Sequence, residues 1–178
     1  TRARKYQSCL ESALDANNIP PQVYHSLVDG VNANLSTFHR YLNLRKRILR
    51  LEDLHYYDLY APLLSDVDLK YTIDESENHI LASLAPLGQE YVNVVKRAFA
   101  ERWMDFYPTE GKRSGAYSNG SVYDVHPYML LNYHGKYDDM STLAHELGHT
   151  MHSYLSNKTQ PYPTSDYPIF VAEVASTF

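Results

Sequence analysis

The sequence predicts a mainly α-helical protein with a small β element, and three observations lead to that prediction. Apolar residues recur at helical spacing through roughly the first hundred residues, with only short connectors between the segments. Four of the seven glycines then fall between Gly111 and Gly135, where turns and short strands are expected. A last set of helical patterns follows, and the first of them contains the motif His-Glu-x-x-His from His145 to His149.

The N-terminal part is expected to consist of helices separated by short breaks. Residues 4–17 fit one helix, which would end at Asn17-Asn18 before Pro20-Pro21. A longer helix of about thirty residues should follow, because apolar residues recur there at near-heptad spacing. That spacing fits either a coiled-coil dimer or a helix packed on its own chain, and we favour the second because further helices follow. The apolar residues are Val23, Leu27, Val31, Leu35, Phe38, Leu42 and Leu49.

Two further helices are expected before the glycine-rich stretch. Tyr56–Leu64 is aromatic and broken by a proline, so it predicts a connector with a short helix. Asp74 and Glu77 resemble a capping box that opens a helix to about Ala85, and Pro86 should begin another that runs to about Met104. No repeat or linker marks a boundary, so we treat residues 1–178 as one segment, helical over 1–107 and different in character over 108–178.

The β element is expected immediately before the helix that carries the motif. Ala116-Tyr117 and Tyr128–Tyr133 are the best strand candidates, and Asn119-Gly120 is a strong turn signal. Asp138 and Asp139 are candidate N-caps of the next helix. An exposed strand edge beside that helix would bind an extended peptide through backbone hydrogen bonds. The glycines match no phosphate-binding loop pattern.

The motif itself indicates a metal site. His145 and His149 are four residues apart, so they lie one turn apart on the same helix face and both imidazoles can reach one ion. An apolar stripe of Leu143, Ala144, Leu147, Met151 and Leu155 lies on the opposite face and should hold the helix in a core. The alternative is a solvated polar face with incidental histidines.

A catalytic zinc site usually has three protein ligands, and three residues could supply the third. His152 is seven residues from His145, about 10.5 Å along the helix, which is too far to share one ion. Asp166 lies in a proline-broken segment and fits a turn or cap residue better. Glu173 lies in an apolar helical run, where a metal would offset the cost of burying its charge. A salt bridge from Glu173 to an Arg or Lys is the alternative.

The run His145–His149, with Glu173 in the setting Phe170–Ser176, resembles the oligoendopeptidase F branch of the thimet oligopeptidase family of zinc metallopeptidases. The resemblance extends through Arg113–Tyr117 and Pro127–Tyr133 and more diffusely through Tyr56–Tyr60 and the early helices. It implies a zincin-like fold and a zinc metalloendopeptidase that hydrolyses short peptides.

By the same resemblance, His145, His149 and Glu173 would bind one Zn²⁺ per chain, and Glu146 would be the catalytic carboxylate. Substrate-binding residues are not assigned. The family's oxyanion-stabilising His and Tyr residues lie on a later segment, so we expect them beyond Phe178. The chain is therefore expected to be truncated at its C-terminus and inactive by itself.

Composition excludes several other classes of function. A net charge of −5 argues against a nucleic-acid surface, since binding phosphates needs clustered Lys and Arg. No apolar run approaches the ~20 residues of a membrane span. A single cysteine forms no intrachain disulfide, which favours a cytoplasmic location. Nothing in the sequence indicates an oligomeric state.

Two alternative functions stay open at this point. The first is a non-catalytic helical interaction module whose metal motif is vestigial. The second is a zinc peptidase of another family that uses two His and one Glu as ligands.

Overall fold

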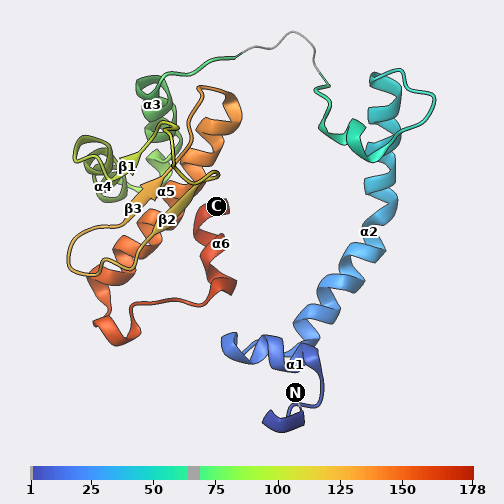
Figure 1. The fold of residues 1–178 in the computed structure, drawn as a ribbon, viewed down its shortest axis with the longest axis horizontal. Helices are drawn as coiled ribbons and strands as arrows, with labels where there is room; N and C mark the ends of the chain where they lie inside the picture. The colour runs from blue at the N-terminus through green and yellow to red at the C-terminus, as the bar shows by residue number, and fades with distance from the viewer. Residues whose placement is uncertain (1, 64–68) are drawn as a thin grey trace. The chain divides into compact units, whose positions relative to one another are not determined.

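The computed structural model describes residues 2–63 and 69–178, and its elements fall into two compact units, Thr1–Val67 and Asp68–Phe178 (Figure 1). The fold is mainly helical with one small three-stranded sheet, as the sequence predicts. Among the described residues, no helix is both long enough and apolar enough to cross a membrane.

The first unit begins with short helices where the sequence predicts one helix over residues 4–17. The chain forms a 3-10 turn at Arg2–Arg4, helix α1 at Cys9–Leu14 and a second 3-10 turn at Asp15–Asn17. The prediction of one continuous helix was therefore wrong. The hydroxyl of Ser8 accepts a hydrogen bond from the amide of Glu11 and sets the start of α1, and Asn18 ends the segment in the left-handed conformation.

Helix α2 (Pro21–Ile48) is the long helix that the apolar spacing predicts, with a proline in its first turn. Within the first unit α2 contacts α1, and most of its apolar side chains are exposed, including Leu27 at 66%. Its buried residue is Arg45, whose guanidinium donates to the carbonyl oxygens of Asp58 and Ala61. These bonds hold the short 3-10 helix Tyr56–Tyr60, which lies in the predicted connector. Leu64, the expected last residue of that connector, lies outside the described residues.

The second unit opens with helix α3 (Ile73–Ser83), and its capping box lies two residues earlier than expected. The hydroxyl of Thr72 accepts from the amide of Glu75 (3.2 Å), and the Glu75 carboxylate accepts from the amide of Thr72 (2.8 Å). Asp74, the expected cap, is therefore already inside the helix.

Helix α4 (Gln89–Ala100) is shorter than the expected helix from Pro86 to Met104. A 3-10 turn occupies Ala85–Leu87, and Gly88 then adopts a φ of 92°, which separates the turn from α4. After α4 the chain passes through Arg102 at a positive φ and enters strand β1 (Met104–Asp105), which the sequence reasoning missed because the strand has only two residues.

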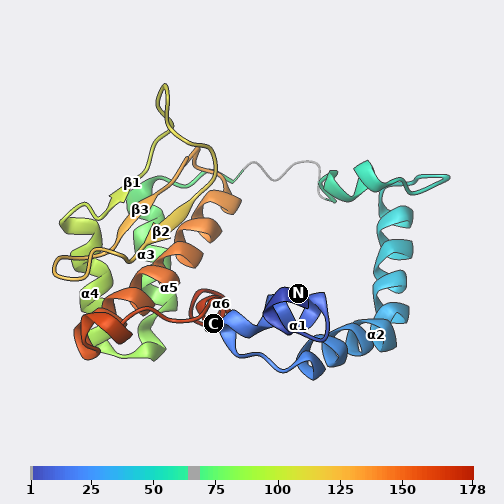
Figure 2. The same ribbon diagram turned by 60° about the horizontal axis from the view of Figure 1, so that its bottom comes forward.

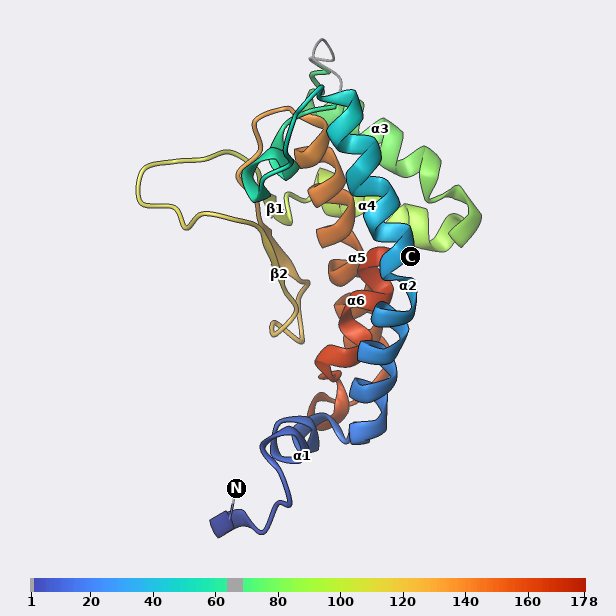
Figure 3. The same ribbon diagram turned by 90° about the vertical axis from the view of Figure 1, so that its right-hand side faces the viewer.

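The sheet consists of β1, β2 (Tyr117–Asn119) and β3 (Tyr128–Leu130) in the order β1-β3-β2. Strand β1 is parallel to β3, and β2 is antiparallel to it. Because β3 is the central strand, β2 lies at an edge of the sheet. Both predicted strands are present. The connection between β1 and β2 projects away from the sheet (Figure 2, Figure 3).

Helix α5 (Tyr137–Thr159) carries the His-Glu-x-x-His motif and lies against the sheet, α4 and helix α6 (Ile169–Thr177). A 3-10 turn at Tyr162–Thr164 lies between α5 and α6. The core of this unit brings together residues from α3, α4, the sheet and α5, namely Ile80, Val95, Ala98, Trp103, Met104, Met129, Leu131, Leu143, Leu147 and Met151.

The apolar stripe predicted for α5 is only partly correct. Leu143, Leu147 and Met151 are fully buried, but Ala144 and Leu155 are exposed. The buried surface of the helix is instead shifted toward Thr150 and Ser153, because the sheet covers that side as well.

The start of α5 is fixed by Asp139, although Lys136 rather than an aspartate occupies the N-cap position. The carboxylate of Asp139 accepts from the backbone amides of Lys136 (2.8 Å) and His134 (3.1 Å). It thereby satisfies the amide of the N-cap residue, as the carboxylate of a capping box does, and ties the preceding residue His134 to the start of the helix.

We predict that Asp139→Ala lowers the free energy of unfolding of this unit by about 1 kcal/mol, the typical cost of losing a helix cap. Asp138→Ala is the matched control, because Asp138 is exposed in the same turn and should change stability by no more than about 0.5 kcal/mol. Urea unfolding followed by the fluorescence of the single tryptophan tests this, since Trp103 is 1% exposed in the core of this unit. Equal losses in the two variants would contradict the assignment.

Candidate active site

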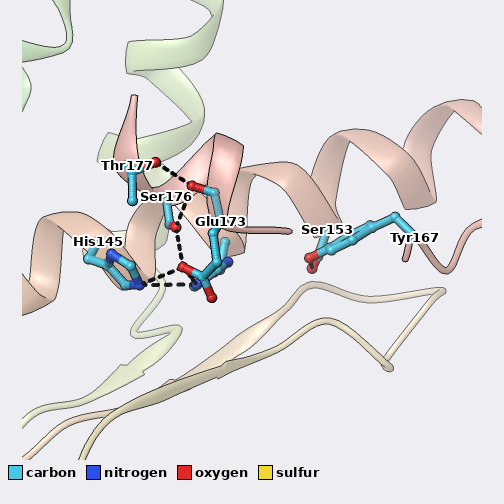
Figure 4. A network of polar contacts seen from close by, with 7 residues as sticks. His145, Ser153, Tyr167, Glu173, Ser176 and Thr177 are labelled. Carbon is cyan, nitrogen blue, oxygen red and sulfur yellow. Dashed lines mark hydrogen bonds and ion pairs between the residues drawn. The ribbon is translucent and has the colours of Figure 1, made fainter. Parts of the chain in front are cut away.

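Three side chains converge where α5 passes α6. The Nε2 atoms of His145 and His149 lie 3.2 Å apart, and Oε2 of Glu173 lies 3.4 Å from the first and 3.6 Å from the second (Figure 4). Ligands at about 2.0–2.1 Å from a tetrahedral zinc ion are separated by about 3.3–3.4 Å. The three atoms therefore fit the corners of a site for one such ion.

Helix geometry and one glycine produce this convergence. His145 and His149 lie one turn apart on α5, so their rings emerge from the same face. Between them, Gly148 lies directly beneath α6. A Cβ at this position would lie 2.5 Å from the carbonyl oxygen of Ala175 and from Cα of Ser176. Only a residue without a side chain lets α6 approach closely enough to bring Glu173 to the imidazoles.

Glu173 has no Lys or Arg partner among the described residues, so the predicted alternative of a salt bridge to one is not observed. Its carboxylate faces the two imidazoles and accepts a hydrogen bond from the hydroxyl of Ser176 at 2.9 Å. Its side chain is also 58% exposed, so the expectation that Glu173 is a buried carboxylate in an apolar run was wrong. Only Ala172 of α6 is buried.

Glu146 lies on the same cleft as the two histidines, but its environment differs from that of Glu173. It is only 8% exposed, and this burial raises its pKa above the ordinary value for a glutamate. His149, His145 and the backbone amide of Ser118 partly offset the effect of burial. A carboxylate with a raised pKa accepts a proton more readily near neutral pH.

The two other candidates for the third ligand do not join the cluster. The ring of His152 stacks on Tyr167, with centroids 3.6 Å apart, and its buried Nδ1 has no hydrogen-bond partner in the described part of the chain. Burial, followed by the effect of His149, lowers the pKa of His152, which favours the neutral ring. Asp166 is exposed in the loop before α6 and lines the same cleft without approaching the imidazoles as a ligand.

The cleft around these residues has a volume of about 750 Å³. One wall is formed by residues 116–123, which include edge strand β2; α5 forms the base, and residues 162–173 form the other wall. Gly120 lets the first wall pack on α5, since a Cβ there would lie 2.2 Å from Oγ of Ser153. A cleft of this size suits a small ligand or an extended peptide segment.

Sequence reasoning did not identify Gly148 or Ser176 as parts of this site. Ser176 could have been noted, because it lies three residues after Glu173 and hence on the same side of a helix. The contact at Gly148 depends on where α6 lies, which the sequence pattern does not reveal.

Comparison with known proteins places the chain in a family. The model of peptidase family M3 matches residues 1–178. The chain belongs to peptidase family M3. That membership removes the alternative of a zinc peptidase from another family and agrees with the resemblance stated from the motif.

Relatives of this M3 chain include the oligopeptidase PepF of Bacillus subtilis, 49% identical over 176 residues, which are 99% of the chain and 26% of the relative. A solved structure from Chlamydophila abortus matches 99% of the chain and 29% of its own length with a TM-score of 0.84 and 49% identity. The oligoendopeptidase-F of Enterococcus faecium matches 99% and 23% with a TM-score of 0.58 and 32% identity. The chain thus spans less than a third of the length of each.

We predict that Gly148→Ala weakens zinc binding by about 10- to 100-fold, the range seen when groups that support metal ligands are lost. The added methyl group would push α6 away from α5 and carry Glu173 off the imidazoles. Gly30→Ala in α2 is the matched control, because a Cβ there meets nothing within 4 Å, and it should leave metal affinity unchanged. Competition titration with a chromophoric zinc chelator measures both variants, and normal affinity in Gly148→Ala would contradict the role of the close helix contact.

Proposed function

We propose that this chain carries the metal centre and the catalytic carboxylate of a zinc-dependent metalloendopeptidase that hydrolyses short peptides. The observation that carries the proposal is the convergence of His145, His149 and Glu173 at separations of 3.2–3.6 Å, with the buried carboxylate of Glu146 on the same cleft. Family M3 membership and the printed names of the relatives, an oligopeptidase and an oligoendopeptidase, support the same conclusion.

The two glutamates have different proposed roles. His145, His149 and Glu173 would hold the ion, which would supply Lewis-acid activation of the scissile carbonyl and lower the pKa of water toward ~7. Glu146 acts as general base and then general acid: it takes a proton from the attacking water and passes it to the leaving nitrogen. The burial of Glu146 supports this role, because it raises the pKa of the carboxyl group above its ordinary value and so makes the carboxylate a better proton acceptor.

The substrate is proposed to bind along β2. This strand pairs with β3 on one side only, and its residues line the cleft that contains the proposed metal ligands. A peptide added at this edge would be held by main-chain hydrogen bonds, so binding would depend little on its sequence. The preference for short peptides rests on the family resemblance.

We also propose that residues 1–178 are one segment of a larger catalytic domain. The relatives are more than three times as long, and the oxyanion-stabilising groups that the family resemblance implies would come from their later residues. The single cysteine supports a cytoplasmic location, and the net charge of −5 supports peptides rather than nucleic acids as partners.

The Glu146→Gln variant of the full-length protein should bind about one zinc per chain and lose peptide turnover by about 10²–10⁴-fold, the usual contribution of a general base. Metal analysis and hydrolysis of a fluorogenic peptide measure the two effects separately. Glu52→Gln, a neutralised carboxylate on the exposed surface of the other unit, is the control and should behave as wild type. Near-normal turnover in Glu146→Gln would contradict its role as base.

The same metal analysis decides between an enzyme and an interaction module with a vestigial motif. About one tightly bound zinc per full-length chain is expected for the enzyme. A wild-type protein that binds none at saturating zinc would favour the module.

Residues 1–178 alone are expected to bind zinc more weakly than the full-length protein and to hydrolyse peptides little or not at all. The reason is that one missing oxyanion donor can reduce turnover by about 10²–10³-fold, while Glu173 lies on a helix with a single buried residue. A parallel assay of both proteins with added zinc tests this expectation. Comparable turnover would show that the oxyanion donors lie within these residues.

A further inference from the structure

We propose that Ser176 is a positioning residue for the metal centre: its hydroxyl fixes the carboxylate of Glu173 with Oε2 turned toward the two imidazoles. The proposal rests on the proposed function, because it assigns Ser176 a role in holding a ligand of the proposed zinc ion. It concerns metal affinity and can be tested without an assay of activity.

Glu173 needs such support because its surroundings constrain it little. Helix α6 has nine residues, of which only Ala172 is buried, and the Glu173 side chain is 58% exposed. No Lys or Arg within the described ranges pairs with it. A free glutamate side chain loses up to ~2 kcal/mol of rotamer entropy when it is fixed, and that loss would weaken metal binding unless the protein fixes the side chain beforehand.

The hydroxyl of Ser176 is the hydrogen-bond donor in contact with this carboxylate. Its Oγ lies 2.9 Å from Oε2 of Glu173 and 3.2 Å from the Glu173 carbonyl oxygen. A hydroxyl has one proton, and the bond to a charged carboxylate is the stronger of the two. Oε2 is also the oxygen that faces both imidazoles. A carboxylate oxygen has two lone-pair sites, so it can accept this bond and still bind an ion.

Ser176 itself is held by the helix that carries the histidines. Its Cα lies where a Cβ on Gly148 would be only 2.5 Å away, so the backbone of Ser176 packs against α5 at the motif. A short path therefore runs from the backbone of α5 to Ser176 and through its hydroxyl to Glu173 (Figure 4). Hydrogen bonds to metal ligands are known to set ligand orientation and affinity.

A second role is available to the same hydroxyl and must be separated from the first. A serine near a helix end often bonds the carbonyl oxygen three or four residues earlier, which affects the helix rather than the metal. Thr177 makes only that kind of contact with Glu173: its Oγ1 donates to the Glu173 carbonyl oxygen and not to the carboxylate. Thr177→Val is therefore a matched control.

The experiment compares Ser176→Ala, Ser176→Thr and Thr177→Val in the full-length protein that contains this sequence. Zinc affinity is measured by competition with a chromophoric chelator, and the thermal midpoint is measured on the metal-free protein. Ser176→Ala should weaken zinc binding by about 10-fold without changing the metal-free midpoint. Ser176→Thr keeps a hydroxyl and should recover affinity to within about 3-fold of wild type, as should Thr177→Val.

Wild-type affinity in Ser176→Ala would overturn the proposal, and so would an equal loss in Thr177→Val, which would place the effect at the end of α6. A wild-type protein that binds no zinc would overturn the proposed function together with this inference. Normal zinc binding by the wild type together with an unaffected Ser176→Ala variant would overturn this inference alone.

Discussion

The close contact between α5 and α6 at Gly148 is the constraint on which the site depends. The two histidines are fixed relative to each other by one helical turn, but Glu173 belongs to a different and weakly buried helix. Its position relative to the imidazoles is set where the backbone of Ala175 and Ser176 lies against Gly148. The glycine inside the His-Glu-x-x-His motif therefore matters for packing, in addition to the chemistry of the residues around it.

The opposite wall of the cleft is held to the same helix by a second set of contacts. The hydroxyl of Ser118 in β2 lies 2.8 Å from that of Thr150, and Gly120 allows the following turn to lie against Ser153. Helix α5 thus positions both the edge strand and two of the proposed metal ligands. A peptide added to β2 would lie along the helix that carries the proposed catalytic carboxylate, as the proposed hydrolysis of a backbone amide requires.

The sequence predicted the parts of this fold that follow from local periodicity. It identified the long helix α2, the strands β2 and β3, and the buried residues Leu143, Leu147 and Met151 of α5, because each is encoded by spacing over a few turns or residues. It misplaced the cap of α3 because Thr72 and Asp74 are both residue types that cap helices, and in the structure Thr72 forms the capping box with Glu75.

Tertiary contacts account for what the sequence did not predict at the site. Ala144 and Leu155 fit the apolar stripe of α5 but are exposed, since the position of the sheet decides which side of the helix is covered. The roles of Gly148 and Ser176 depend in the same way on α6 lying across α5. Motif spacing predicted the types of the proposed ligands, whereas the contacts that support them became visible only in three dimensions.

Two carboxylates line the same cleft but differ in their exposure to solvent. Glu146 of α5 is almost fully buried, and desolvation raises its pKa, which suits the proposed role of taking up and releasing a proton. Glu173 is half-exposed on a short helix, where two imidazoles and a hydroxyl surround one of its oxygens. A group that is to bind an ion must be fixed in direction, and the hydrogen bond from Ser176 to one of its oxygens favours that condition. The same residue type is thus suited to the two roles proposed for it, because the fold gives each copy a different solvent exposure and different partners.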